Sequence, residues 1–146
     1  MFTALSTAHS YLRYILLILL VINIVTTLYG WLGKRKYSNV DDKLSLALFI
    51  STHLQLTLGL VLYFLWTSQS GVFADMKSTM QTPALRYFTV EHLVGMLVAI
   101  VSISLGRIIA KKATTDEDKF KRAFIYFATG LVVIAGMLWH MPGSGQ

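Results

Sequence analysis

Residues 87–109 read YFTVEHLVGMLVAIVSISLGRII, and this stretch decides the fold. It contains no charged residue between His92 and Arg107. A helix needs roughly 20 apolar residues to cross the hydrocarbon core of a bilayer. Three further apolar stretches of suitable length lie at 12–31, 44–66 and 123–141. The sequence therefore predicts an all-α integral membrane protein in which four transmembrane helices form an antiparallel four-helix bundle.

The composition of the chain agrees with this prediction. Hydrophobic residues make up 55% of the 146 residues and charged residues 14%, against about 25% in typical soluble domains. The mean hydropathy is +0.60. The sequence has no cysteine, which excludes disulfides, iron–sulfur ligation, thiolate zinc sites and cysteine nucleophiles. A chain of this length is predicted to form a single membrane domain over residues 1–146.

The basic residues are divided unevenly between the two ends of the predicted bundle. Of the 13 Lys and Arg residues, 10 lie at the connections between the first and second spans and between the third and fourth. The other 3 are Arg13, Lys77 and Arg86. The positive-inside rule then predicts that both termini and the 67–85 loop face outward. Because every basic cluster lies at a membrane exit, the net charge of +6 does not indicate nucleic-acid binding.

Ionisable residues inside apolar spans are costly, so each is a candidate site residue. All four histidines of the chain belong to this group. At 1.5 Å of rise per residue, His9 lies at the outer rim, His92 about 7 Å deeper and His53 roughly 15 Å deep, near the midplane. The full set is His9, Arg13, His53, Glu91, His92 and His140.

Helical spacing places each histidine on a stripe that can face the bundle interior. Small residues on such a stripe allow another helix or a flat ligand to approach closely. On the second span, Gln55 lies on a different face from His53, beside Thr52 and Gly59. The stripes are His9, Arg13, Leu16, Leu20, Asn23 and Thr27; Phe49, His53, Leu56, Thr57 and Leu60; His92, Gly95, Ala99, Ser102 and Gly106; and Thr129, Val133, Gly136 and His140.

Inward-facing imidazoles in a bundle without thiolates indicate haem b, because imidazole is the usual iron ligand in such sites. The preferred iron ligands are His53 and His92, since the deeper pair is better shielded from water; His9 with His92 is the alternative. His53 and His92 differ in depth by about 8 Å, and His9 and His92 by about 7 Å. Helix tilt must reduce this offset if either pair is to bind one iron. Arg13 is the predicted partner of a haem propionate.

Two other functions use the same residues. In a non-catalytic small subunit of a larger membrane complex, the polar groups would serve helix association. A quinone or metal site without haem could be built at the outer rim from His9, Arg13, Glu91 and His92. No serine or carboxylate pair accompanies a histidine at a recognisable spacing, so an electron carrier or accessory subunit is favoured over a stand-alone enzyme.

Five segments of the chain look familiar together. They are 9–14 (HSYLRY), 30–34 (GWLGK), 42–45 (DKLS), 53–56 (HLQL) with Gly59 and Tyr63, and 86–92 (RYFTVEH). They resemble a group of small four-span membrane proteins from Bacteroidota that are commonly labelled cytochrome-b-like. The resemblance covers nearly the whole chain, and its most specific part is Arg86–His92. It implies the four-helix membrane fold, a haem-dependent role in a respiratory chain and a place in the bacterial inner membrane, where the charge distribution predicts that both termini are periplasmic. The residues that match are His9, Arg13, His53, Glu91 and His92, whereas His140 has no match.

The charge distribution gives a prediction about topology. Reporter domains fused after Gln146 and after Lys112 should lie on opposite sides of the membrane, the first outside and the second inside, because the basic end is retained in the cytoplasm. Compartment-specific activity of the two reporters measures this. The same side for both fusions would contradict the four-span arrangement.

Overall fold

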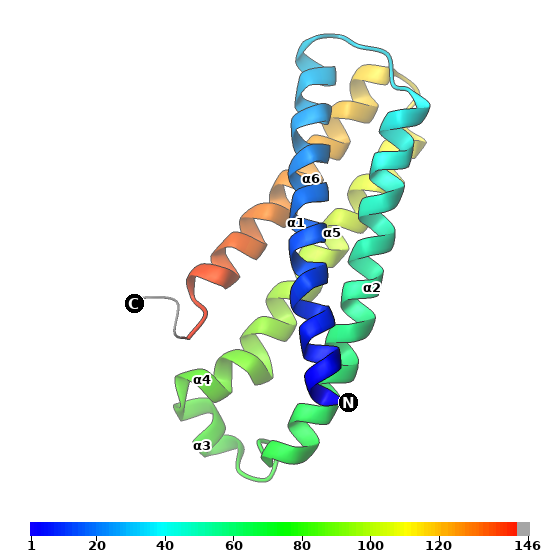
Figure 1. Cartoon of the computed structure of the whole chain (residues 1–146). Coiled ribbons are helices and arrows are strands. Elements are labelled where there is room, and N and C mark those ends of the chain that lie inside the picture. Colours follow the sequence, from blue (N-terminus) through cyan, green and yellow to red (C-terminus); the bar gives the residue numbers. More distant parts are fainter. Residues whose placement is uncertain (143–146) are drawn as a thin grey trace.

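The computed structural model describes residues 1–142 and is helical throughout, with no strand in that range (Figure 1). Four helical segments are long and apolar enough to cross a membrane, which confirms the predicted fold class. They contain the long helices α1 (Phe2–Leu32), α2 (Asn39–Ser70), α5 (His92–Lys112) and α6 (Asp116–Trp139). Between α2 and α5 lie α3 (Met76–Gln81), α4 (Pro83–Arg86) and the π-helical turn η1 (Tyr87–Glu91).

The helices are longer than the predicted spans at most of their ends. Helix α1 begins at Phe2 rather than near residue 12, and α2 covers Asn39–Ser70 rather than 44–66. The apolar stretch marks only the part of a helix that suits hydrocarbon. The backbone hydrogen bonds of the helix continue into more polar surroundings, because no glycine or proline interrupts them there.

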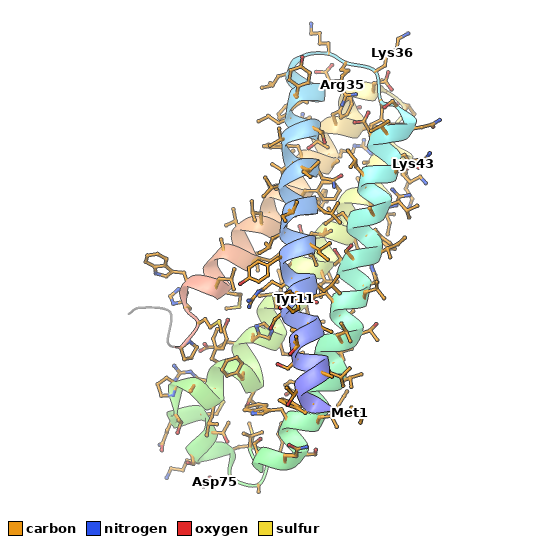
Figure 2. The ribbon with its side chains drawn as sticks, viewed as in Figure 1. Met1, Tyr11, Arg35, Lys36, Lys43 and Asp75 are labelled. Carbon is orange, nitrogen blue, oxygen red and sulfur yellow. The ribbon has the colours of Figure 1, made fainter. Side chains whose placement is uncertain are left out.

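The four long helices form a ring in which α1 packs against α2 and α6, and α5 packs against the same two helices. Helices α1 and α5 are therefore diagonal in the bundle. Both basic connections lie at one end: Figure 2 shows Arg35, Lys36 and Lys43 there, and Met1 and Asp75 at the other. This end is called the basic end below. Away from it, α5 and α6 lean apart from α1 and α2 (Figure 1).

Small residues bring α5 close to α6, as the stripe on the third span predicted. Ala99, Ser102 and Gly106 are buried. A Cβ atom on Gly106 would lie 2.8 Å from Phe127, and the Ser102 hydroxyl donates a hydrogen bond of 2.7 Å to the carbonyl of Tyr126. The absence of a Cβ on Gly106 thus provides the space that Phe127 fills.

The prediction for the fourth span was wrong. Thr129, Gly136 and His140 are exposed, and nothing lies within 4 Å of a Cβ placed on Gly136. The buried stripe of α6 contains large residues instead, because α6 supplies the aromatic rings that fill spaces beside glycines of α1 and α5. This stripe is Phe120, Ala123, Phe127, Gly130 and Ile134.

Charged and polar side chains connect the helices at the basic end. Arg107, 9% exposed, donates to the Ser45 hydroxyl at 2.7 Å and lies 3.2 Å from the Asp42 carboxylate. Asp41 is the third residue of α2: it accepts from the Ser38 backbone N–H at 2.9 Å and pairs with Arg35 at 2.7 Å. Ser38 and Asp41 thereby form a capping box at the start of α2. The contacts of Arg107 hold α2 and α5 together at the basic end, so the two helices can separate only beyond it.

The glycine contacts predict the effect of adding one methyl group. Gly106→Ala should destabilise the bundle by about 1–3 kcal/mol, because the added Cβ overlaps Phe127 in a packed interface. The matched control is Gly136→Ala, where the Cβ meets nothing within 4 Å and alanine favours the helix. Thermal unfolding in detergent measures both. Equal midpoints for the two variants would contradict the close contact between α5 and α6.

Candidate functional site

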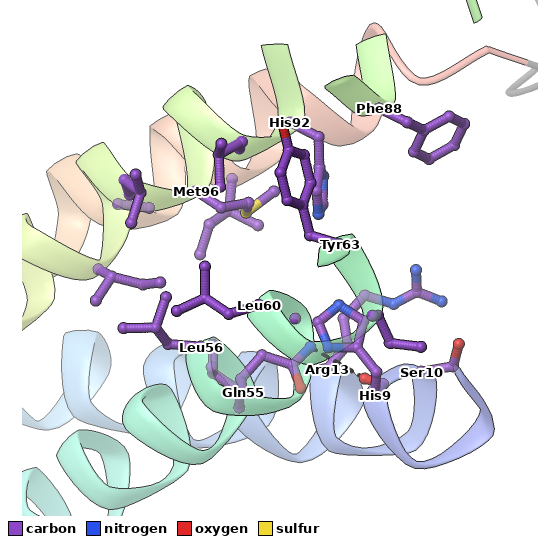
Figure 3. A pocket seen from close by; sticks show the side chains of 18 of the residues that line it. His9, Ser10, Arg13, Gln55, Leu56, Leu60, Tyr63, Phe88, His92 and Met96 are labelled. Atoms are coloured by element: carbon purple, nitrogen blue, oxygen red, sulfur yellow. Dashed lines mark hydrogen bonds between the residues drawn. The ribbon is translucent and has the colours of Figure 1, made fainter. Parts of the chain in front are cut away.

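A cavity of about 450 Å³ lies in the half of the bundle away from the basic end. It is lined by residues of α1, α2, η1, α5 and α6, most of them leucine, isoleucine, methionine or aromatic. A mainly apolar cavity of this size with a few polar groups is typical of small-molecule sites. Figure 3 shows His9 and Arg13 on one wall and His92 on the opposite wall. The main polar residues of the lining are His9, Arg13, Gln55, Tyr63, Tyr87 and His92.

The position of His9 is determined by α2. A Cβ on Gly59 would lie 3.2 Å from His9 Cε1, so the imidazole packs directly on the surface that Gly59 leaves open. Gln55 Nε2 donates a hydrogen bond of 3.0 Å to the backbone carbonyl of His9. This bond fixes the first turns of α1 against α2 and directs the ring of His9 into the cavity (Figure 3).

His92 is the first residue of α5 and follows the π-helical turn η1 directly. Two tyrosines fix this turn. Tyr63 of α2 donates to the Thr89 carbonyl at 2.9 Å, and Tyr87 donates to the Met137 carbonyl of α6 at 2.8 Å. Single π turns inside helices occur frequently at functional sites, because the extra residue changes the direction of the following side chain. The turn thereby sets the direction in which His92 leaves α5.

Three buried polar atoms of the cavity residues lack a hydrogen-bond partner within the described part of the chain. They are Nδ1 of His9, Nδ1 of His92 and Oε1 of Gln55. A buried polar atom without a partner costs about 1–3 kcal/mol, so such groups are rare unless a ligand or water completes them. All three atoms belong to residues that line the cavity, which makes His9, Gln55 and His92 the candidates for contacts with a ligand.

Arg13 lies one helical turn after His9 on the same wall. Its guanidinium donates to the Tyr14 hydroxyl at 3.2 Å and lies 4.9 Å from the centre of the Tyr14 ring. Tyr14 is exposed, whereas Arg13 is half-buried. Arg13 thus provides a positive charge at the edge of the cavity, where it can pair with an anionic group of a ligand.

His53 does not belong to the described lining of this cavity. Its Nδ1 lies 2.8 Å from the carbonyl of Phe49 on the same helix, and the centres of the two rings are 4.2 Å apart. Leu48 and Thr52 are buried, so they determine the rotation of α2 about its axis. His53 is the next residue after Thr52, and its side chain is therefore turned by about 100° around the helix from that of Thr52. Leu56 and Leu60 of the predicted His53 stripe belong to the described lining of the cavity, whereas His53 itself does not. The residues of α2 in the lining are Thr52, Gln55, Leu56, Gly59, Leu60, Leu62, Tyr63 and Trp66.

Two other candidate residues also lie outside the described lining. Glu91 pairs with Arg86, with Nε and Oε1 2.9 Å apart, and both side chains are half-exposed. His140 is exposed at the end of α6. Of the predicted residues, the structure thus brings together His9, Arg13 and His92.

The sequence reasoning did not assign a role in the site to Gln55, Tyr63 and Tyr87. Gln55, Gly59 and Tyr63 follow one another at intervals of four residues, the spacing of one helical face. That spacing was the available signal. For Tyr87 there was none, because its role depends on the π-helical turn and on a carbonyl of α6.

The chain has no native cysteine, so cysteine pairs can test which histidine positions face each other. His9→Cys with His92→Cys should become cross-linked by a short bifunctional thiol reagent, because both positions line one cavity. His53→Cys with His92→Cys is the matched control and should react poorly. Mass spectrometry of the intact protein measures the yield. A higher yield from the control pair would show that the deeper pair meets instead.

Within residues 1–142 no group of three or more His, Cys, Asp and Glu side chains is arranged to hold a metal ion. The cavity therefore offers two imidazoles rather than a complete set of ligands for a bare metal. In the comparisons with known proteins, no family model, no curated protein and no solved structure matches this chain.

Proposed function

We propose that the cavity binds a b-type haem between His9 and His92, and that the protein transfers electrons in a respiratory chain, alone or as a subunit. The observation that carries the proposal is the pair of imidazoles from α1 and α5 at one apolar cavity, each with a buried ring nitrogen that has no partner among the described residues. In helical bundles, cofactor ligands come from side chains on facing helices. The expected pair thereby changes from His53 and His92 to His9 and His92.

The residues present fit this group in three respects. Neutral imidazole is a common haem ligand, and Nδ1 of each ring has no hydrogen-bond partner among the described residues. The apolar lining excludes water, which protects a redox centre from side reactions. Arg13 at the cavity edge matches the carboxylate of a propionate with its planar donors.

The chain's own residues position the two ligands. Gly59 allows His9 to pack directly on α2, and Gln55 anchors the backbone of His9. Tyr63 holds η1, which directs His92. When bound, a haem supplies one-electron chemistry at its iron, while the protein supplies ligands, orientation and a dry cavity.

The proposal includes a location. The basic end faces the cytoplasm of a bacterial inner membrane, so the cavity lies toward the periplasmic side with both termini. Apolar side chains on the outer faces of the helices, such as Ile18, Val25 and Val132, are more than half exposed and contact lipid. A larger respiratory complex or a second copy of the chain could cover part of the same surface.

A second candidate function is quinol binding without haem. Gln55 Oε1 is a buried acceptor without a partner in the described range, and the hydroxyl groups of a quinol are donors. The leucines of the cavity would surround an apolar ring. This function needs the same residues but gives no haem spectrum.

The haem proposal predicts a spectrum and its response to substitution. Protein expressed with haem available should show, when reduced, the α-band of a low-spin six-coordinate b-type haem, because His9 and His92 would both ligate the iron. His9→Ala and His92→Ala should each abolish the band or convert it to a high-spin form. Absorption spectroscopy of the purified protein measures both effects.

The matched controls are His53→Ala and His140→Ala, which remove histidines outside the described lining and should leave the spectrum nearly unchanged. Loss of the band in His53→Ala but not in His9→Ala would show that the iron ligands are His53 and His92 instead. Gently purified protein without a Soret band would overturn the haem proposal. Bound quinol or a co-purifying membrane partner would then support quinol binding or the accessory-subunit function.

A further inference from the structure

A second pocket of about 280 Å³ lies at the basic end, far from the cavity of the histidines. Residues from the loop before α2, the start of α2, the end of α5 and the start of α6 form it, so it lies between helices that can span the membrane. Its lining residues are Tyr37, Ser38, Asn39, Asp42, Lys111 and Lys119.

The charges around this pocket leave an excess of positive charge. Asp42 is the acidic residue of the described lining, and its Oδ1 lies 3.2 Å from Arg107 and 3.6 Å from Lys111 Nζ. Two cations thus share one carboxylate, and Lys119 adds a third cation. The neighbouring Asp41 is already paired with Arg35 through two hydrogen bonds of 2.7 and 3.0 Å.

Asp116, Glu117 and Asp118 of the first turn of α6 are absent from the described lining of the pocket. Lys119 is held in place by packing, with its Nζ 5.3 Å from the centre of the Tyr37 ring. A lysine that is already oriented loses less conformational entropy when an anion binds.

The pocket also has uncharged hydrogen-bond donors. Burial, with the charges of Asp42 and Asp41 as smaller causes, raises the pKa of Tyr37. Its hydroxyl therefore remains protonated and can donate a hydrogen bond at neutral pH. Asn39, which is exposed at the first position of α2, carries a further side-chain donor. Ammonium, phenol and amide donors together suit a phosphate oxygen, which accepts several hydrogen bonds.

From these observations we propose that the pocket of Lys111, Lys119 and Tyr37 binds the phosphate headgroup of an anionic phospholipid. The location favours a lipid over a free anion, because the pocket opens where the apolar helices end and where headgroups lie. Basic pockets between transmembrane helices at this level are recognised sites for anionic headgroups. The acyl chains would lie along the exposed apolar side chains of α2 and α5, such as Leu46 and Ile108.

The experiment compares two double variants with the same change of net charge. Full-length protein is exchanged into mixed micelles that contain equal amounts of phosphatidylglycerol and phosphatidylcholine, and native mass spectrometry measures the retained lipid. The unchanged protein should prefer phosphatidylglycerol, and Lys111→Gln with Lys119→Gln should reduce its retention roughly tenfold. The control pair Lys112→Gln with Lys121→Gln removes lysines beside the pocket but outside its described lining and should change retention little.

Each other outcome overturns the proposal. Equal losses in both double variants would show a general attraction to the basic end rather than a site. If the unchanged protein shows no preference for phosphatidylglycerol, that result alone overturns the proposal. A third arm adds inorganic phosphate to the loaded protein: release of the lipid by phosphate at millimolar concentration would identify a free-anion site. Thermal unfolding of both variants verifies that the bundle is intact.

Discussion

The packing of phenylalanine rings of α6 into spaces beside glycines of α1 and α5 is the contact on which the bundle depends. Phe120 would overlap a Cβ on Gly30, and Phe127 a Cβ on Gly106, at distances of 2.6 and 2.8 Å. Hydrophobic burial gives little driving force between helices in lipid, so close packing of this kind must supply the attraction. Both contacts lie in the basic half of the bundle, together with the fully buried Leu20 and Leu48.

The cavity follows from this uneven distribution of contacts. In the basic half, large rings meet small residues and Arg107 joins α5 to α2, so the helices stay close together. Toward the other end α5 and α6 diverge from α1 and α2, as Figure 1 shows, and the helices are joined there by single hydrogen bonds from Gln55, Tyr63 and Tyr87. A bundle packed tightly at one end and linked by a few polar bonds at the other can hold a ligand without loss of its core.

The sequence predicted the parts that depend on local periodicity. Four apolar stretches predicted four helices, and the small-residue stripe of Gly95 to Gly106 correctly indicated the interface of α5. The depth of a residue in the bundle and the rotation of its helix were harder to predict. The choice of His53 rested on depth counted along ideal helices, but the rotation of α2 is determined by Leu48 and Thr52, which pack against other helices. The π-helical turn before His92 was not predicted either, because it depends on tyrosines of α2 and η1 that bond to distant carbonyls.

The position of the two histidines on diagonal helices has a consequence for the bundle as a whole. The bonds in the open half join α1 to α2, α2 to η1 and η1 to α6, each a pair of neighbours. None of these three joins α1 to α5 directly. A ligand held by both His9 and His92 would supply that diagonal connection, and the proposed haem would thereby stabilise the half of the bundle that has the weakest protein contacts. A ligand that binds the folded state alone stabilises it in proportion to its occupancy. The stability of the open half and the occupancy of the cavity would then be linked in one equilibrium.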